Sequence, residues 1–122
     1  MDSNTNTPQQ VSGLRHIVMW NLKEQAEGHS RHENMLKARD ILLQFANLTP
    51  DILLFEVGIK TEGQDCTSDL ILNSVFKDEA ALKTYQNHPD HLAIKPFMKA
   101  VVEQRHCMDF KIHAVSLFND CF

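Results

Sequence analysis

Residues 52–76 read ILLFEVGIKTEGQDCTSDLILNSVF, two apolar stretches on either side of a polar loop. The stretches ILLFEVGI (52–59) and DLILNSVF (69–76) are rich in branched and aromatic residues, which favours two β-strands. The connecting KTEGQDCT is polar and contains a glycine, which is typical of a loop. This part of the chain therefore predicts two successive strands of a sheet.

Both strands carry apolar side chains on both faces, because alternate residues of a strand point to opposite sides of its sheet. One side of the first strand has Leu53, Phe55, Val57 and Ile59, and the other has Ile52 and Leu54. The second strand separates Leu70, Leu72 and Phe76 from Ile71 and Val75. If the face of the sheet away from the helices were exposed to solvent, it would expose more contiguous apolar area than soluble monomers tolerate. We therefore expect a second sheet to cover it, most simply in a two-fold homodimer.

The residues before these strands predict a further strand and a helix. LRHIVMWNL, residues 14–22, has the composition of a strand. Ser30 is followed three residues later by Glu33, the spacing of a capping box at the start of a helix. An amphipathic helix is expected from there to about Asn47. Its apolar residues, at helical intervals, are Met35, Ala38, Leu42 and Phe45.

The residues that follow predict a second helical region and a last strand. Asp78 can cap a helix, which is expected to end at His88 because Pro89 disfavours helical geometry in the residue before it. Since Pro96 can also open a new turn, a broken helical stretch is expected after Pro89 rather than one rod. A last strand is expected over about 105–112.

The resulting order is strand, helix, strand, strand, helix, strand (βαββαβ). This is the ferredoxin-like split βαβ arrangement of the α+β class, an antiparallel sheet with helices on one face. We expect one domain over residues 13–113. Residues 1–12, MDSNTNTPQQVS, are expected to be a disordered polar tail. Residues 114–122 are expected to be a C-terminal tail that either extends the last strand or packs on a partner.

Composition and charge exclude several classes of protein. The 122 residues carry a formal net charge of -4 with basic residues scattered among acidic ones, which argues against nucleic-acid binding. We expect no membrane partner, because no apolar stretch is long enough to span a bilayer and the N-terminus does not resemble a signal peptide. Cys66, Cys107 and Cys121 are too widely spaced for a disulfide framework or a Cys-x-x-Cys motif, which favours a cytoplasmic location.

Histidines are the residues that best indicate reactivity. The segment YQNHPDH, residues 85–91, places a phenol and two imidazoles where one helix ends and the next begins. His91 is a candidate general base, oriented by Asp109, and Tyr85 a candidate acid that donates to a carbonyl oxygen as an enolate forms. The residues expected to line or orient the pocket with them are His16, Val18, Trp20, His88 and Asp109.

The same side chains also have structural interpretations. His88 can interact with the last carbonyls of a helix. His91 can be a buried histidine that bonds to Asp109 or to the backbone, and His16 can be part of the core or the pocket wall. Tyr85 can pack in the core with its hydroxyl satisfied. The residue types alone leave these alternatives open.

Metal and nucleotide cofactors are not expected. The pairs His29–His32 and His88–His91 have a spacing that can place two imidazoles on one helical face, but no cysteine or acidic partner completes either set. The sequence contains no glycine-rich phosphate loop, nucleophile elbow or dinucleotide fingerprint. Any chemistry is therefore expected to be independent of cofactors.

Three segments together resemble the stress-responsive A/B barrel (Dabb) family: RHIVMWNLK, LKTYQNHPDHLAIKPFMKAVVEQR and CMDF. The resemblance spans about residues 14–112 and implies a dimeric α+β barrel, in which two ferredoxin-like protomers join their sheets. The family contains plant stress-associated proteins and a cofactor-independent polyketide cyclase that performs an aldol condensation. In that cyclase the Tyr and the second His of YxxHPxH are the acid and the base. The resemblance therefore implies these roles for Tyr85 and His91.

Three functional hypotheses result. The leading one is a small cytoplasmic homodimer with an apolar pocket for a carbonyl-bearing or aromatic small molecule, in which His91 and Tyr85 act as base and acid. The first alternative is a non-catalytic, stress-associated or ligand-binding barrel. The second is an enzyme like the cofactor-free monooxygenases, which share the dimeric barrel.

Overall fold

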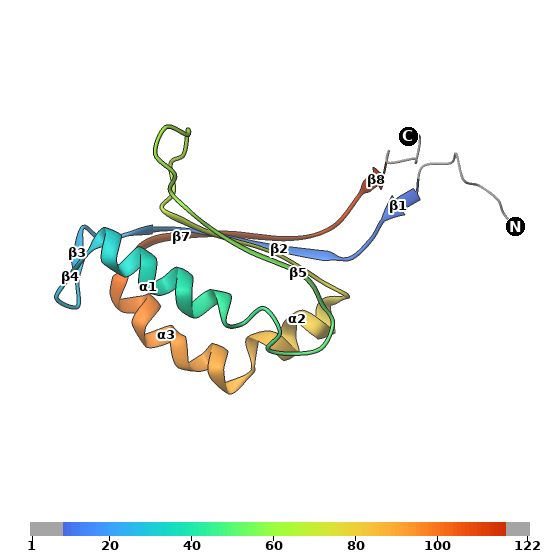
Figure 1. The fold of residues 1–122 in the computed structure, drawn as a ribbon. Helices are drawn as coiled ribbons and strands as arrows, with labels where there is room; N and C mark the ends of the chain where they lie inside the picture. The colour runs from blue at the N-terminus through green and yellow to red at the C-terminus, as the bar shows by residue number, and fades with distance from the viewer. Residues whose placement is uncertain (1–8, 117–122) are drawn as a thin grey trace, which may run out of the picture.

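A computed structural model describes residues 9–116, which include a four-stranded antiparallel sheet with three helices against one face (Figure 1). The strands, in spatial order, are β5 (Ile52–Ile59), β6 (Leu70–Phe76), β2 (Leu14–Leu22) and β7 (Val102–Lys111). The helices are α1 (Arg31–Leu43), α2 (Glu79–Gln86) and α3 (Pro89–Val101). Chain order is β2, α1, β5, β6, α2 with α3, and β7, so the predicted ferredoxin-like α+β fold is confirmed.

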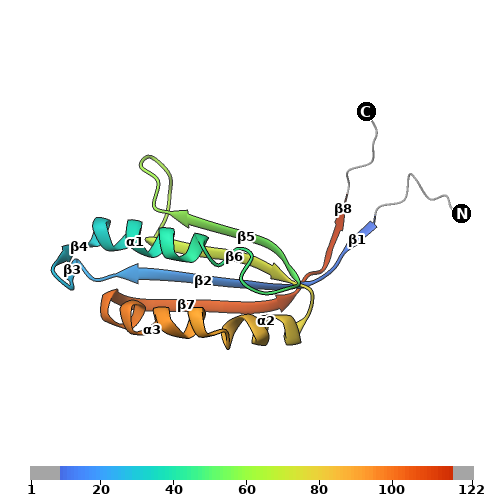
Figure 2. The same ribbon diagram turned by 60° about the horizontal axis from the view of Figure 1, so that its bottom comes forward.

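Two pairs of short strands lie outside this sheet. Just before α1, β3 (Gln25–Ala26) pairs with β4 (His29–Ser30). The second pair, β1 (Gln9–Val11) with β8 (Ala114–Ser116), is an antiparallel ribbon formed by the two segments that flank the domain. It leaves the sheet where β2 begins and β7 ends (Figure 2).

Local capping explains where the first helix begins. The Ser30 side chain accepts a hydrogen bond from the backbone N–H of Glu33 at 3.2 Å, and Glu33 Oε1 accepts one from the Ser30 N–H at 2.9 Å. This is the predicted capping box, which satisfies two of the otherwise free N–H groups at a helix start. The helix ends at Leu43, earlier than predicted, and a series of turns leads to β5.

The two prolines of the second helical region have different effects. Pro89 is the first residue of α3, and the chain breaks between α2 and α3 as predicted. The prediction that Pro96 also breaks the chain is wrong, because Pro96 lies inside the continuous helix α3. Pro96 is exposed, and so is Leu92, whose carbonyl loses its intrahelical donor and can bond to water instead. Within the described residues, no helix is long and apolar enough to cross a membrane.

The core lies between the helices and one face of the sheet. Strands β2 and β6 supply its centre, with residues that alternate along each strand: Val18, Trp20, Leu22, Leu70, Leu72 and Phe76. The predicted placement of Leu53 on the same face as Phe55 is wrong. A register shift between Ile52 and Leu54 moves Ile52 onto the core face and leaves Leu53 60% exposed.

The other face of the sheet is not covered by any described element (Figure 1). It is apolar along much of β2, β6 and β7, and it includes Met19, Ile71 and Met108, of which Met108 is 64% exposed. A line of hydrogen bonds crosses it, since Arg15 Nη1 donates to Asn73 Oδ1 at 2.7 Å and Asn73 Nδ2 donates to Glu56 Oε1 at 2.9 Å. We call this surface the open face.

Two segments rise on the side of the open face. They are the loop of residues 60–69 at one end of the sheet and the β1–β8 ribbon at the other (Figure 1). The helices lie on the opposite side. The open face is therefore flanked at both ends.

Candidate functional site

A cavity of about 370 Å³ lies between the helix-covered face of the sheet and helices α2 and α3. This volume is within the roughly 300–1,000 Å³ of typical small-molecule sites. Most of the residues predicted for the site line it, from three separate elements: His16, Val18 and Trp20 of β2, Tyr85 of α2 and His91 of α3. The break between α2 and α3 brings the last two together, as predicted. We call this space the central cavity.

Tyr85 is fully buried at the inner end of the central cavity. Its ring packs against those of Phe45, Phe55 and Phe76, with centroids 6.4, 6.0 and 5.1 Å away. Its hydroxyl oxygen, in contrast, has no hydrogen-bond partner among the described residues. Burial raises the pKa of Tyr85 well above its usual value, so the hydroxyl remains protonated and is a donor near neutral pH.

His91 occupies the first turn of α3, and the preceding residues fix its position. His88 is the N-cap of this helix, and its Nδ1 accepts a hydrogen bond from the Asp90 N–H at 3.0 Å. The ring of His91 consequently lies against that of Tyr85, with centroids 4.8 Å apart and planes inclined by 67°. His88 thus acts on the site through the backbone and does not line the central cavity.

The surroundings of His91 favour its neutral form. Its Nδ1 is buried and has no hydrogen-bond partner within the described part of the chain. Burial lowers the pKa of His91, and repulsion from Lys95, His16 and Arg105 lowers it further, while the Gln86 backbone acts in the opposite direction. A neutral imidazole with a free ring nitrogen is a proton acceptor.

Asp109 binds His16 and not His91, so the predicted pairing of His91 with Asp109 is wrong. Asp109 Oδ1 lies 2.5 Å from His16 Nδ1. The reason is the sheet register, because β2 and β7 are neighbours and these two residues lie directly opposite each other. His16 is almost completely buried, and the carboxylate orients its ring at the wall of the central cavity.

Three cationic residues of the central cavity were not predicted: Lys95, Lys99 and Arg105. The lysines follow His91 at intervals of four residues, so all three share one face of α3. This spacing could have predicted both lysines from the sequence. Arg105 had no such signal, because it reaches the cavity from β7, where it lies opposite Trp20.

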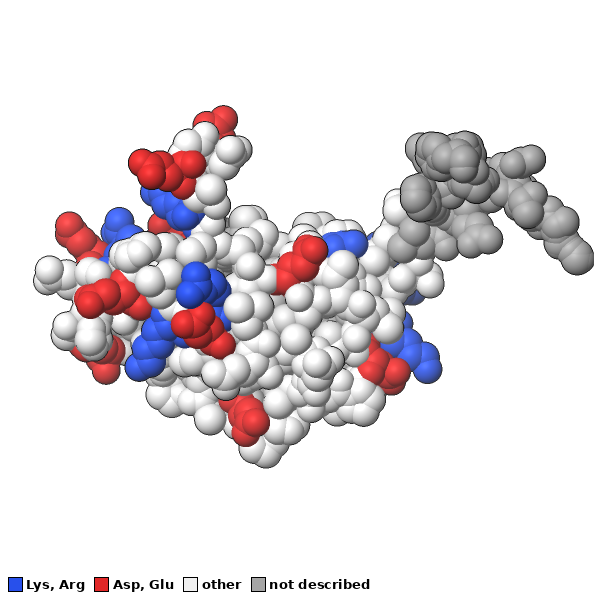
Figure 3. Space-filling view, viewed as in Figure 1, with Lys and Arg blue, Asp and Glu red and all other residues white. Residues whose placement is uncertain are grey.

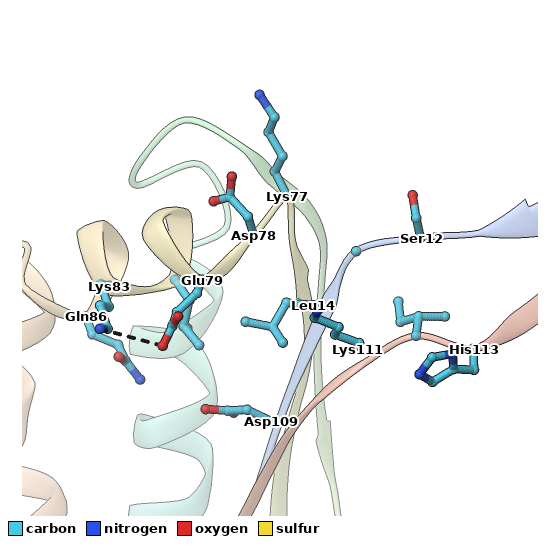
Figure 4. Close-up of a pocket in the computed structure, with 13 residues that line it drawn as sticks. Ser12, Leu14, Lys77, Asp78, Glu79, Lys83, Gln86, Asp109, Lys111 and His113 are labelled. Carbon is cyan, nitrogen blue, oxygen red and sulfur yellow. Dashed lines mark ion pairs between the residues drawn. The ribbon is translucent and has the colours of Figure 1, made fainter.

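A second cavity, of about 620 Å³, lies between α2 and the end of β7, with Asp109 in its wall. Glu79 and Lys83 of α2 and Lys111 of β7 line it as well (Figure 4), and Lys83 Nζ lies 3.6 Å from Glu79 Oε2. Acidic and basic side chains are interspersed over the face of the molecule shown in Figure 3 as well. None of the buried polar atoms found without a partner belongs to the residues that line this second cavity.

The described residues include no group of three His, Cys, Asp or Glu side chains close enough to share a metal ion. The buried, unpartnered polar atoms of residues 9–116 are Thr49 Oγ1, Tyr85 Oη and His91 Nδ1. Two of these three, a phenol oxygen and an imidazole nitrogen, belong to residues of the central cavity. Buried polar groups normally have partners, which makes this pair the strongest candidate for a ligand site among the described residues.

Comparisons with known proteins agree with this fold. A model of the stress responsive A/B barrel domain family matches residues 14–112. A search of curated proteins finds no match. Among solved structures, a dimeric protein of unknown function with a ferredoxin-like fold from Bacteroides fragilis has a TM-score of 0.69 and 23% identity, covering 81% of this chain and 95% of its own.

Two further structures have the same fold. A Dabb family protein from Mesorhizobium loti has a TM-score of 0.59 and 23% identity, over 82% of this chain and 96% of its own. A hydroxynitrile lyase from Passiflora edulis has a TM-score of 0.66 and 19% identity, over 87% of this chain and 95% of its own. At these identities the likeness shows the fold alone.

Proposed function

This chain belongs to the stress responsive A/B barrel domain family, and from that premise we propose that it binds a small carbonyl compound in the central cavity and catalyses cofactor-independent acid–base chemistry on it. The observation that carries the proposal is the pair of buried, unpartnered polar atoms, Tyr85 Oη and His91 Nδ1. Their rings are in contact and they belong to residues of one cavity. A protonated phenol and a neutral imidazole are the forms that an acid and a base need before reaction.

The chemistry follows from these two groups. The His91 imidazole takes a proton from the carbon next to the ligand carbonyl, and the C–H electron pair becomes part of an enolate. The enolate oxygen accepts a hydrogen bond from the Tyr85 hydroxyl, which stabilises the developing charge. The enolate carbon attacks a second carbonyl, and the imidazolium returns its proton to the new alkoxide. Protons and electrons balance without an oxidant, a reductant or a metal.

His16 serves as a positioning residue in this proposal. Asp109 Oδ1 lies 2.5 Å from His16 Nδ1, which fixes the orientation of the imidazole and leaves Nε2 as the ring nitrogen that does not contact the carboxylate. His16 is therefore suited to orient a ligand hydroxyl or a water molecule in the central cavity. The hydroxynitrile lyase from Passiflora edulis is a lyase with the same fold, which supports this class of activity for the scaffold.

Hydrogen exchange on a ketone probe tests the proposal directly. Full-length protein is incubated with benzylacetone in D₂O, and loss of the proton signals next to the carbonyl is followed by NMR. We expect the wild type to accelerate exchange and His91→Ala to abolish the acceleration. His32→Ala, a change of an exposed histidine on α1, is the matched control and should leave exchange unchanged.

The alternative of a non-catalytic binding protein predicts a different result. Benzylacetone would raise the melting temperature of the protein, because a ligand that binds only the native state stabilises it, but exchange would not accelerate. If neither a thermal shift nor exchange occurs across a panel of aryl and alkyl ketones, both the catalytic and the binding forms of the proposal fail.

We also propose that the chain forms a two-fold homodimer through the open face. Its apolar side chains include Met19, Ile71 and Met108, which a second sheet would remove from water. The loop of residues 60–69 and the β1–β8 ribbon lie at the two ends of this face (Figure 1). The relative from Bacteroides fragilis is described as dimeric, which supports this arrangement.

A further inference from the structure

The charged residues that line the central cavity all have the same sign. They are Lys95, Lys99 and Arg105, and no Asp or Glu lines this cavity. The protein as a whole has a formal net charge of -4, so its composition does not predict a cavity lined by positive charges alone. The second cavity shows the ordinary pattern, because lysines and carboxylates alternate in its wall.

Among the described residues, these three cations have no carboxylate partner. Within residues 9–116, none of them forms an ion pair with Asp or Glu. The contact found for the Arg105 guanidinium is with the thiol of Cys107, at 3.4 Å. Their positive charge also acts on the cavity, because repulsion from Lys95 and Arg105 contributes to the lowered pKa of His91.

The positions of the cations make the two ends of the cavity different. Lys95, Lys99 and Arg105 are exposed, whereas Tyr85 and His16 at the inner end are buried. Between the two ends the wall consists of apolar and aromatic side chains, among them Val18 and Trp20. A ligand that fits has an apolar body toward Tyr85 and a negative charge toward solvent.

We infer that the ligand of the central cavity is a small carboxylate with an apolar or aromatic body, its carboxylate bound by Lys95, Lys99 and Arg105 at the mouth. The inference rests on the proposed binding function of this cavity and adds the chemical class of the ligand. A carboxylate is favoured over a larger anion because a cavity of about 370 Å³ holds a compact body, and the planar guanidinium of Arg105 matches carboxylate geometry.

Paired probes that differ only in charge test the inference. Hydrocinnamate and hydrocinnamamide have the same phenyl body, and hexanoate and hexanamide supply an aliphatic pair. Binding to the full-length protein is measured by titration calorimetry near neutral pH. We expect each acid to bind about tenfold more tightly than its amide, and the preference to weaken as salt is added.

Charge-neutralising variants identify the residues that cause the preference for the acid over the amide. Lys99→Gln and Arg105→Gln should each weaken binding of the acid severalfold more than binding of the amide, and so reduce the preference for the acid. Lys83→Gln is the matched control, because Lys83 is an exposed lysine that lines the second cavity and not the central one. Melting temperatures of all three variants should stay near that of the wild type, so a changed preference reports on the ligand.

The outcomes separate this inference from the proposed function. Equal binding of acid and amide overturns the carboxylate inference and leaves the cavity a binding site. If neither the acid nor the amide of each pair binds, both the carboxylate inference and the proposed binding function are overturned. A preference that survives Lys99→Gln and Arg105→Gln but is lost in Lys83→Gln also overturns the inference, because the anion would then lie in the second cavity.

Discussion

Asp109 lies directly opposite His16 across the β2–β7 pair, and its Oδ1 is 2.5 Å from His16 Nδ1. The carboxylate therefore orients the histidine of the sheet, and His91 of α3 has no acidic partner within residues 9–116. This division gives the site two imidazoles in different settings. One is fixed by a carboxylate, and the other is surrounded by rings and positive charge.

A double-mutant cycle distinguishes the two pairings. We expect His16→Ala and Asp109→Asn to be coupled by about 1 kcal/mol in unfolding free energy, the usual scale for a hydrogen bond, reduced by the 43% exposure of the Asp109 side chain. His91→Ala and Asp109→Asn should be additive within about 0.5 kcal/mol. Urea denaturation of the single and double variants provides the measurement. Strong coupling between His91 and Asp109 would contradict this assignment.

Removal of the Tyr85 hydroxyl should stabilise the protein. Because this oxygen is buried without a partner, Tyr85→Phe relieves a desolvation cost and should raise the unfolding free energy by about 1 kcal/mol. If Tyr85 is the acid, the same change lowers the rate of exchange on benzylacetone.

Ser74→Ala is a suitable comparison for Tyr85→Phe, because it also removes one buried hydroxyl. Ser74 Oγ donates to the His16 carbonyl at 2.9 Å, so this variant should lose about 1 kcal/mol of stability. Changes of opposite sign in the unfolding free energy for the two deletions would show that the Tyr85 hydroxyl has no partner in the protein and is available to a ligand. A loss of stability in Tyr85→Phe would instead show that its hydroxyl has a structural partner.

The fold was largely predictable because its signals are local. The run of branched and aromatic residues gave β5 its bounds, Ile52–Ile59, and the Ser30–Glu33 spacing gave the start of α1. The errors arose where one residue's effect depends on distant neighbours. Pro96 is tolerated because it lies on the solvent side of α3, and the register shift beside Leu53 is set by pairing with β6.

The candidate site was predictable only in part, for a similar reason. Tyr85 and His91 are six residues apart, so a helix break was enough to bring them together. The partner of Asp109 depends on which strands are neighbours and in what register, and local sequence does not contain that information. Arg105 joins the cavity through the same strand pairing, which explains why it was missed.

Stability should depend on pH through His91. Its pKa is lowered in the folded protein from an ordinary value of 6.5, so the unfolded chain binds the proton more tightly. The contribution is therefore fully present above pH 6.5 and is lost as the pH falls from there through the native pKa. His91→Gln should flatten the melting temperature over this range, whereas His32→Gln should not. An unchanged pH profile in His91→Gln would contradict the lowered pKa.

The open face provides the test of assembly. Light scattering of the wild type should give about twice the protomer mass of 14.0 kDa. Ile71 lies on the open face, between Met19 of β2 and Gly58 of β5. Ile71→Lys would bury an unpaired charge against a second sheet, at a cost of several kcal/mol, and should yield monomers or unfolded protein. Leu92→Lys, at an exposed position on α3 behind the sheet, should remain dimeric. A monomeric wild type, or an Ile71→Lys variant that remains a dimer, would show that this face is not the interface.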